Sequence, residues 1–215
     1  MEDLVIIKYN AGNIQSVLYA LERIGVKALV TDDYEKIKSA KKVIFPGVGE
    51  ASSAMRYLKE HKLDALIKDL QQPVLGICLG MQLMCAYSEE NDTTCLNIFD
   101  EQVKKFIPPT DGDRAEAGTA IPSAVEKQGA FKVPQIGWND IFNLKTGLFR
   151  DLPDNSFCYF VHGYYAALGE HTIATADYIQ PYSAALHRDN FYGVQFHPEK
   201  SAKAGEQILK NFLSL

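Results

Sequence analysis

One cysteine in this chain lies in a setting that can make it a nucleophile. The segment PVLGICLGMQ, residues 73–82, joins a short apolar run, typical of a buried strand, to the start of a helix. Cys78 lies at the turn between them, with Gly76 and Gly80 two residues away on either side. Glycines this close permit the strained backbone of a nucleophile elbow, and the positive end of the helix favours a thiolate over a thiol. The pattern alone is only moderately specific, so the prediction depends on partner residues.

A base and a residue that orients it are both present in one short motif, QFHPE at residues 195–199. His197 and Glu199 follow an apolar strand predicted over 192–196, and Pro198 between them restricts the turn. Glu199 would hold the imidazole in one tautomer and stabilise its protonated form. A surface turn with a hydrated histidine and glutamate is the alternative for this motif alone. Beside the cysteine elbow, a catalytic pair is favoured.

A third motif, PGVG at residues 46–49, directly follows a strand predicted over 43–45. Glycines at such a strand end let backbone N–H groups point into the crevice where open α/β sheets bind ligands. One such donor, together with the N–H of Leu79, would stabilise an oxyanion. A plain turn between strand and helix is an equally good interpretation of this motif alone.

The other cysteines and histidines show no pattern of this kind. Cys85, Cys95 and Cys158 have no CxxC or His/Cys spacing, so neither zinc nor any other metal site is expected. Cys85 is predicted to be a small buried apolar residue. His162 is the one further histidine expected near the crevice, since it follows an aromatic run at residues 157–161.

The elements that must position these residues alternate along the first half of the chain. This alternation predicts an α/β fold with a mostly parallel sheet covered by helices on both faces, and the strand-rich second half adds antiparallel or mixed strands. Strands are predicted over 4–7, 26–30, 43–45, 73–77, 96–99, 157–161, 172–176, 184–187 and 192–196, and helices over 14–24, 51–60, 81–87 and 201–213.

Length and composition indicate one domain spanning residues 1–215. The segment 108–132 is the least regular part and is predicted to be an irregular excursion. A net charge of −5 argues against nucleic acid or an anionic membrane as the main partner. No apolar run reaches the ~18 residues that cross a bilayer, the first residues lack a signal-peptide layout, and the four cysteines suit a reducing, cytoplasmic location.

Together and in this order, PGVG, GICLGMQ and HPEK resemble the triad-type (class I) glutamine amidotransferases. Softer motifs are similar to one branch of them, the glutaminase subunits of imidazole glycerol phosphate synthases: YNAGN at residues 9–13, GWN at 137–139, YFVHGY at 159–164 and the KS that follows HPE. The resemblance covers nearly the whole chain. It implies a flavodoxin-like sheet, a Cys-His-Glu triad, no cofactor, and a heterodimer with a (β/α)8-barrel synthase subunit that consumes the ammonia.

The resemblance also implies a role for each matching residue. Cys78 would be the nucleophile, His197 the general base and acid, and Glu199 its orienting residue. The oxyanion hole would use backbone N–H groups of Val48, Gly49 and Leu79; glutamine would be held by Gln82, Glu90, His162 and Gly163; the partner face and ammonia passage would involve Asn10, Asn13, Trp138, Asn139 and Lys200.

Two departures from the family pattern keep an alternative open. Gly163 stands where a small hydroxyl residue is usual, and the excursion over 108–132 is longer than usual. A glutaminase of the same fold that supplies ammonia to another synthase, such as one that amidinates surface sugars, is therefore the second interpretation. A non-enzymatic scaffold and a single-chain hydrolase or peptidase are disfavoured, because the triad residues, Gln82 and Glu90 are all present.

Overall fold

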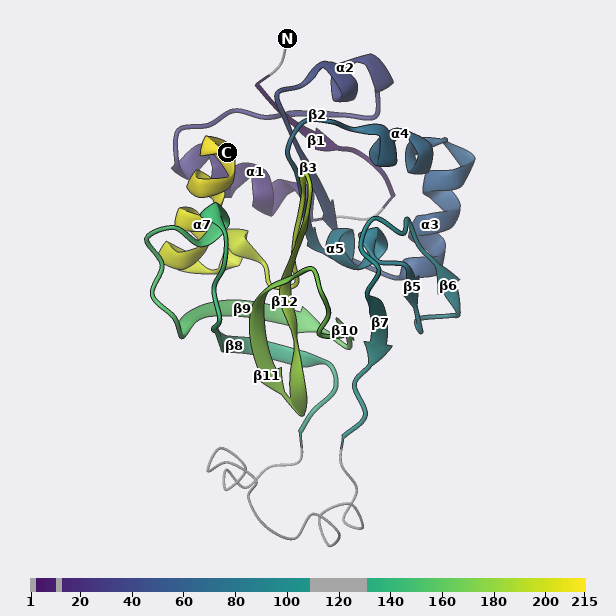
Figure 1. The fold of residues 1–215 in the computed structure, drawn as a ribbon. Helices are drawn as coiled ribbons and strands as arrows, with labels where there is room; N and C mark the ends of the chain where they lie inside the picture. Colours follow the sequence, from purple (N-terminus) through teal and green to yellow (C-terminus); the bar gives the residue numbers. More distant parts are fainter. Residues whose placement is uncertain (1–2, 11–12, 109–130) are drawn as a thin grey trace, which may run out of the picture.

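A seven-stranded sheet forms the centre of the computed structural model, which describes residues 3–10, 13–108 and 131–215 (Figure 1). The excursion predicted over 108–132 lies outside the described residues apart from its ends. The order is β11-β12-β13-β4-β3-β1-β2. The five strands from β13 to β2 in this order are parallel, whereas β11 and β12 are antiparallel, which confirms the predicted mostly parallel sheet. The strands are β1 Leu4–Ile7, β2 Leu29–Thr31, β3 Lys42–Gly47, β4 Val74–Cys78, β11 Thr172–Tyr178, β12 Gln180–Arg188 and β13 Phe191–Val194.

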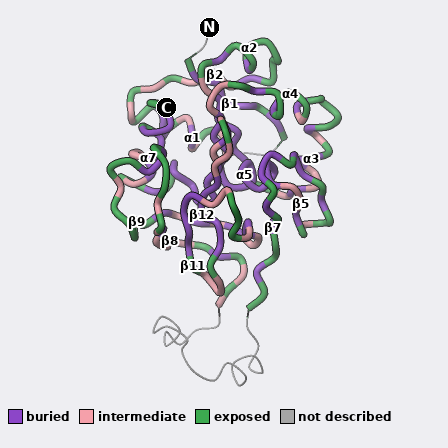
Figure 2. The backbone as a smooth tube through the Cα atoms, in the orientation of Figure 1, coloured by how far each residue is buried: buried purple, intermediate pink, exposed green. Residues whose placement is uncertain are grey.

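Helices cover both faces of this sheet, and side chains of β1 alternate between the two resulting cores. Val5 and Ile7 pack in the cluster that contains α3, whereas Leu4 and Ile6 pack in the cluster that contains α1 and α7. Because both faces are covered, β1 and β4 are buried along their whole length (Figure 2). The helices are α1 Ile14–Arg23 and α7 Ala202–Ser214 on one face, α3 Ala51–Glu60, α4 Leu63–Asp69 and α5 Leu79–Met84 on the other, and α2 Tyr34–Ser39 near the end of the sheet (Figure 1).

Two smaller sheets lie beside the central one. The first has the order β10-β7-β5-β6, and the second is the antiparallel pair β8-β9. Their strands are β5 Tyr87–Ser88, β6 Thr93–Thr94, β7 Gln102–Lys105, β8 Gln135–Ile141, β9 Ser156–His162 and β10 Tyr164–Ala166. Of these only β9 is predicted from the sequence.

The strand predicted over 96–99 is wrong. The backbone N–H groups of this segment are used by the end of α5: Leu96 donates to Leu83, and Ile98 and Phe99 both donate to Met84. The segment therefore caps a helix end whose carbonyls would otherwise lack partners. Its apolar side chains are buried by that contact, which explains why it resembles a strand in sequence.

Other predicted elements exist with shifted ends. Strand β2 begins at Leu29 instead of residue 26, because the N–H of Val26 bonds back to Leu21 at the end of α1. Helix α5 begins directly at Leu79 and ends before Tyr87, which joins β5. Within the described ranges, no helix has the length and apolar character needed to span a membrane.

The last helix is fixed to the rest of the molecule by a buried amide. Asn211 of α7 donates hydrogen bonds of 3.0 Å to the Leu148 carbonyl and 2.7 Å to the Arg150 carbonyl. We expect Asn211→Ala to lower the free energy of unfolding by about 1–3 kcal/mol, since the carbonyls of buried Leu148 and of Arg150 both lose their donor. Urea unfolding measures the change. Lys210→Ala, at the exposed neighbouring position, is the control, and equal losses in both variants would contradict this role of the amide.

Candidate functional site

Cys78 occupies the turn from β4 to α5 and carries the backbone strain itself. Its φ and ψ are 53° and −109°, in a region that non-glycine residues rarely adopt. Gly80 supplies space: a Cβ there would lie 1.9 Å from the carbonyl oxygen of Phe45 in β3. A Cβ on Gly76 would lie 2.9 Å from the backbone of Gly80. The glycines therefore serve close packing of α5 on the sheet, and the predicted elbow is confirmed.

The sulfur of Cys78 has two polar neighbours besides the imidazole of His197. Its Sγ lies 3.8 Å from the carbonyl oxygen of Val161 in β9, and 3.7 Å from Nε2 of Gln195. Gln195 is completely buried. This glutamine belongs to the predicted QFHPE motif but is given no role there; a lone amide within an otherwise apolar strand end is the signal that identifies it.

His197 and Glu199 form the predicted pair. The Nδ1 of His197 lies 2.8 Å from Glu199 Oε1, and the two side chains are only 4% and 2% exposed. A short 3-10 helix, Pro198–Lys200, begins with the proline that restricts the turn. The N–H of His197 bonds to the Tyr159 carbonyl in β9. This pair is therefore buried, and the hydrated surface turn is excluded.

Ser201 fixes this turn to β9 and is a second residue whose role is not predicted from the sequence. Its hydroxyl donates to the His197 carbonyl at 2.6 Å and accepts from the Tyr159 N–H at 2.9 Å. One buried hydroxyl thus joins the histidine turn to the strand that passes the sulfur.

The environment of His197 favours its charged form. Burial alone would lower the pKa of its imidazole, but its interactions with the Cys78 sulfur and the Glu199 carboxylate outweigh burial and raise the pKa to about 10. The imidazole is therefore coupled to both residues. Sulfur, imidazole and carboxylate are brought together from two loops that lie more than a hundred residues apart in sequence.

The PGVG motif lies at the same sheet edge as Cys78. Strand β3 extends through Gly47, which pairs with Cys78, while Pro46 pairs with Ile77. Val48 is 39% exposed, and Gly49 has a φ of 113° before α3 begins. The motif is thus both the turn into α3 and a set of backbone N–H groups near the elbow, where Leu79 supplies the first N–H of α5.

The residues predicted to hold glutamine differ in how free their side chains are. Gln82 is buried and donates from Nε2 to the Tyr164 carbonyl and to Gln195. Glu90 accepts a 2.8 Å hydrogen bond from the N–H of Ala51, and burial raises the pKa of its carboxyl. Gln82 and Glu90 are thus held by internal hydrogen bonds, and Glu90 is the less buried of the two.

His162 is committed to the interior. Burial lowers the pKa of its imidazole to about 4, and its Nδ1 lies 2.7 Å from the Tyr164 carbonyl, which requires the proton on Nδ1. The Gly163 carbonyl accepts from the Phe106 N–H. A Cβ on Gly163 would meet only Val133 and Pro134, at 3.7 and 3.8 Å, so the missing hydroxyl side chain is not excluded by space.

Of the predicted partner-face residues, the structure brings two together. Trp138 is 53% exposed, and its ring packs edge-on at 5.8 Å from that of Tyr159. Lys200 places its ammonium 5.9 Å from the centre of the same Tyr159 ring. Asn139 instead donates to the Asp177 carbonyl in β11. Asn10 is exposed beyond β1, and Asn13 precedes α1 without a side-chain capping bond.

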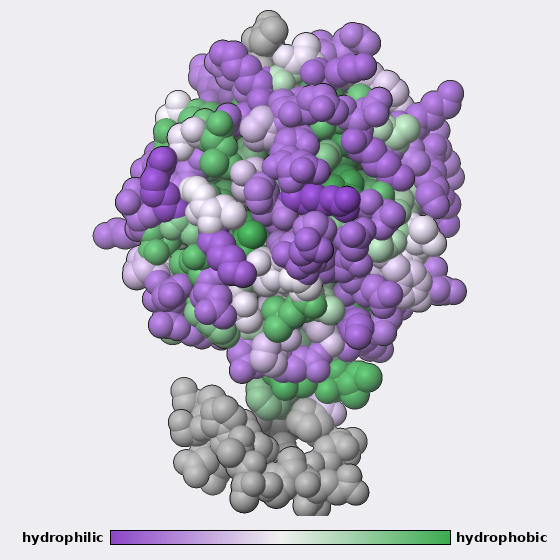
Figure 3. Space-filling model, viewed as in Figure 1, coloured by the Kyte–Doolittle hydropathy of each residue, from purple (hydrophilic) through white to green (hydrophobic). Residues whose placement is uncertain are grey.

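Large exposed apolar side chains gather on β8 and β9. The face of the molecule in Figure 3 is mostly hydrophilic with scattered hydrophobic patches. Ile136 and Trp138 of β8 and Phe157 of β9 are 64%, 53% and 59% exposed. Register places Trp138 opposite Tyr159 and Ile136 opposite Val161, so these side chains lie close together on one sheet face.

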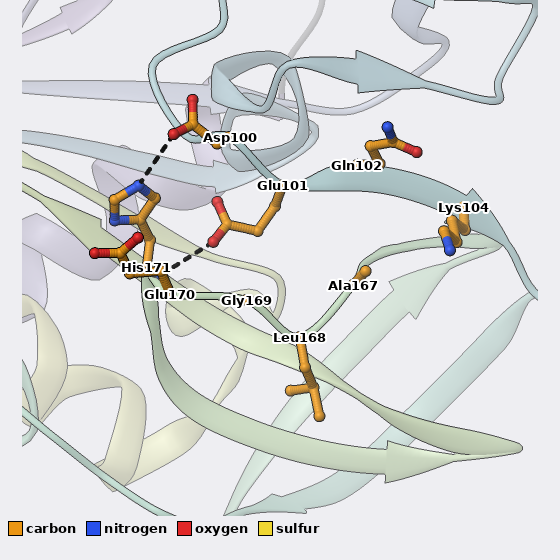
Figure 4. Close-up of a pocket in the computed structure, with 9 residues that line it drawn as sticks. All are labelled: Asp100, Glu101, Gln102, Lys104, Ala167, Leu168, Gly169, Glu170 and His171. Atoms are coloured by element: carbon orange, nitrogen blue, oxygen red, sulfur yellow. Dashed lines mark hydrogen bonds and ion pairs between the residues drawn. The ribbon is translucent and has the colours of Figure 1, made fainter.

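A separate hollow lies away from Cys78. Asp100, Glu101 and His171 line it, and Glu101 accepts the N–H of His171 (Figure 4). Arg188, the last residue of β12, donates a hydrogen bond to Asp100. In the sheet, Arg188 pairs with Phe191, which pairs in turn with Val74, the first residue of β4. The hollow thus lies at the sheet edge opposite the elbow. In the ranges 3–10, 13–108 and 131–215, no three His, Cys, Asp or Glu residues are grouped to hold a metal.

Comparison with known proteins identifies the family. Residues 5–215 match the model described as glutamine amidotransferase class-I. The chain is 55% identical to "Imidazole glycerol phosphate synthase subunit HisH" of Bacteroides fragilis and 53% identical to that of Bacteroides thetaiotaomicron, with 99% of each chain covered. A HisH subunit from Idiomarina loihiensis is 39% identical over 99% of this chain and 98% of its own.

Solved structures of low identity share the fold. A protein described as part of a GMP synthase, from Thermoplasma acidophilum, superposes with a TM-score of 0.70 at 18% identity, covering 100% of this chain and 94% of that one. PurLQS from Thermotoga maritima gives a TM-score of 0.65 at 15% identity, covering 100% and 99%. The class I amidotransferase fold predicted from the sequence is therefore confirmed.

Removal of the Glu199 charge tests the coupling at His197. We expect Glu199→Gln to lower the pKa of the imidazole, because burial is then opposed by the sulfur alone; NMR titration of the ring protons measures it. Between about pH 6.5 and pH 10 the imidazole of wild-type His197 keeps its proton in the folded state and loses it in the unfolded state. This proton therefore stabilises the folded state fully below pH 6.5, and the stabilisation is lost as the pH rises through about 10.

In Glu199→Gln, the free energy of unfolding should fall less between pH 6.5 and pH 10 than it does in the wild type. Glu206→Gln is the matched control, because it removes a carboxylate that forms a partly exposed ion pair with Arg23. Identical His197 titrations in both variants would show that Glu199 does not set the charge of the imidazole.

Proposed function

Because this chain belongs to the class I glutamine amidotransferase family, we propose that Cys78, His197 and Glu199 are the residues with which it hydrolyses glutamine. Its high identity to the Bacteroides subunits makes it the glutaminase subunit of an imidazole glycerol phosphate synthase. One observation carries the assignment of the triad. A cysteine in a strained elbow is coupled to a buried histidine, which is in turn hydrogen-bonded to a buried glutamate.

The reaction follows from these contacts. His197 takes the proton of the thiol, and the Cys78 sulfur attacks the side-chain amide carbon of glutamine. His197 then gives the proton to the departing nitrogen, so ammonia leaves and a thioester remains. His197 next takes a proton from water, whose oxygen attacks the thioester carbon; the carbon–sulfur bond breaks, glutamate is released, and His197 returns the proton to the departing sulfur. Glu199 holds Nδ1 and stabilises the imidazolium in each step.

The negative oxygen formed in each attack needs nearby donors. The N–H of Leu79, first in α5, and an N–H of Val48 or Gly49 beyond β3 are the proposed donors. Support comes from the pairing of Gly47 with Cys78, which fixes both donor segments to neighbouring strands. Typical losses on removal of one such donor are about a hundredfold to a thousandfold in turnover.

Substrate binding is proposed for Gln82, Glu90, His162 and Gly163. The partly buried carboxylate of Glu90 is suited to the α-ammonium group of glutamine. Since the side chain of His162 is neutral and turned inward, we assign only the backbone of His162 and Gly163 to the α-carboxylate.

The ammonia is proposed to pass to a (β/α)8-barrel subunit in a cytoplasmic heterodimer. The barrel would convert its bound nucleotide to imidazole glycerol phosphate and an aminoimidazole carboxamide ribotide. All four cysteines are free thiols, which suits a reducing compartment. The exposed apolar face of β8 and β9 supports a docking surface there, with Trp138 and Lys200 at its centre and Asn10, Asn13 and Asn139 as further contacts. Similarity to HisH subunits favours this synthase over the sugar-modifying alternative.

Replacement of the nucleophile tests the proposed triad. In the complex with the barrel, Cys78→Ala should abolish glutamine-dependent product formation, by about a thousandfold or more, and leave ammonia-dependent formation intact. Cys85→Ala is the control, since Cys85 is a buried thiol that bonds to the Met81 carbonyl. A Cys78→Ala complex that still uses glutamine, with the ammonia reaction preserved, would refute the assignment.

Truncation of the exposed tryptophan tests the proposed docking surface. Trp138→Ala should weaken binding of the barrel subunit by about tenfold or more, because large aromatic side chains dominate interface energies. Titration of glutaminase activity with the barrel and its nucleotide gives the affinity. Leu168→Ala, which alters a similarly exposed apolar residue beside the opposite sheet edge, is the control. Equal affinities of the two variants would place the interface elsewhere.

A further inference from the structure

One buried side chain bridges the predicted nucleophile and a predicted substrate-binding residue. Gln195 follows β13, and its backbone N–H bonds to the Ala184 carbonyl. Its Nε2 lies 3.7 Å from the Cys78 sulfur, while its Oε1 accepts a 2.8 Å hydrogen bond from Gln82. No part of this side chain is exposed to solvent, so its only possible partners are within the protein.

A backbone carbonyl fixes the direction of both amides. Gln82 Nε2 lies 2.9 Å from the Tyr164 carbonyl oxygen, which can only accept. Gln82 must therefore present its NH₂ group, whose second hydrogen is donated to Gln195. Gln195 consequently presents its oxygen to Gln82 and its own NH₂ group to the sulfur.

The sulfur needs such a donor only when it is negatively charged. A neutral thiol can donate its hydrogen to the Val161 carbonyl, 3.8 Å away. A thiolate has no hydrogen to donate and requires donors, and Cys78 as a whole residue is only 7% exposed, which limits the donors that water can supply. Hydrogen bonds to a charged group in a buried site are stronger than those between neutral groups.

We propose that Gln195 is a fourth catalytic residue, whose amide donates a hydrogen bond to the Cys78 thiolate while Gln82 fixes its direction. The thiol proton goes to His197, as above, and Gln195 exchanges no proton. The same donor serves again when the thioester is hydrolysed and the sulfur departs as a thiolate. This inference rests on the proposed role of Cys78 as the nucleophile.

Gln195→Glu tests the proposal with little change of shape. It keeps an oxygen toward Gln82 but replaces the N–H donor with a carboxylate oxygen, so the thiolate should form at higher pH. The readout is the pH dependence of alkylation of Cys78 by iodoacetamide, followed by mass spectrometry. We expect the profile to move up by about one pH unit or more. In the barrel complex near neutral pH, kcat should fall about tenfold or more, with a smaller change in KM.

Two further variants distinguish the effect of losing the N–H donor from the effect of adding a negative charge and from a general structural effect. Gln195→Met removes the donor without adding a charge, and should shift the alkylation profile in the same direction. Gln135→Glu places a carboxylate at another buried glutamine, which accepts from Tyr182, and should leave the profile unchanged. The titratable groups that act on the sulfur, His197 and Tyr9, are intact in all three variants.

The outcomes are decisive in each case. An upward shift in both Gln195 variants supports the donor role. Wild-type profiles in both, or a shift in Gln195→Glu alone, overturns it; if Gln195→Glu does not fold by circular dichroism, Gln195→Met decides. Failure of the proposed function is distinguishable, because Cys78→Ala would then keep glutamine-dependent activity whatever the Gln195 variants do.

Discussion

The site depends on one close contact, that of the first turn of α5 with the backbone of β3. Gly80 lies so near the Phe45 carbonyl that a single added carbon would collide with it. This contact holds the left-handed backbone of Cys78, a conformation that costs on the order of 1–3 kcal/mol elsewhere. Strand β4 lies between β3 and β13, so the same register that pairs Gly47 with Cys78 also pairs Val194 with Ile77. The PGVG segment, the cysteine and the histidine turn are thereby set at one sheet edge.

Burial lowers the pKa of both histidines near this edge, and their different partners decide the outcome. His162 has a backbone carbonyl as its main partner, so burial wins and its pKa falls to about 4. His197 faces the Cys78 sulfur and the Glu199 carboxylate, which reverse the effect of burial. A buried charge is stable only with a partner of opposite charge, which is why the glutamate is as necessary as the imidazole. One histidine is suited to structure and the other to proton transfer.

Most of the central sheet and the elbow can be predicted from the sequence, because both depend on local patterns. Buried apolar runs identify β1, β3 and β4, and the spacing of Gly76 and Gly80 identifies the turn at Cys78. The pattern fails where tertiary contacts use the backbone: the segment 96–99 donates its N–H groups to the end of α5, and short strands such as β7 have too few residues for a period to emerge. Gln195 is missed for a related reason, since its role depends on two side chains that meet only in the folded chain.

Strand β9 joins the predicted docking surface to the proposed catalytic groups. Its side chains alternate, with Cys158, Phe160 and His162 buried and Phe157 and Tyr159 on the outer face. The outer ring of Tyr159 contacts Trp138 and lies near Lys200, whereas its backbone carbonyl holds the N–H of His197. Two residues further on, the Val161 carbonyl faces the sulfur. A partner docked on this face would therefore press on the same strand that sets the positions of the imidazole and the thiol. Partner binding and glutamine hydrolysis could therefore be coupled through β9 alone, because one face of this strand contacts the docking surface and its backbone contacts the histidine and the cysteine.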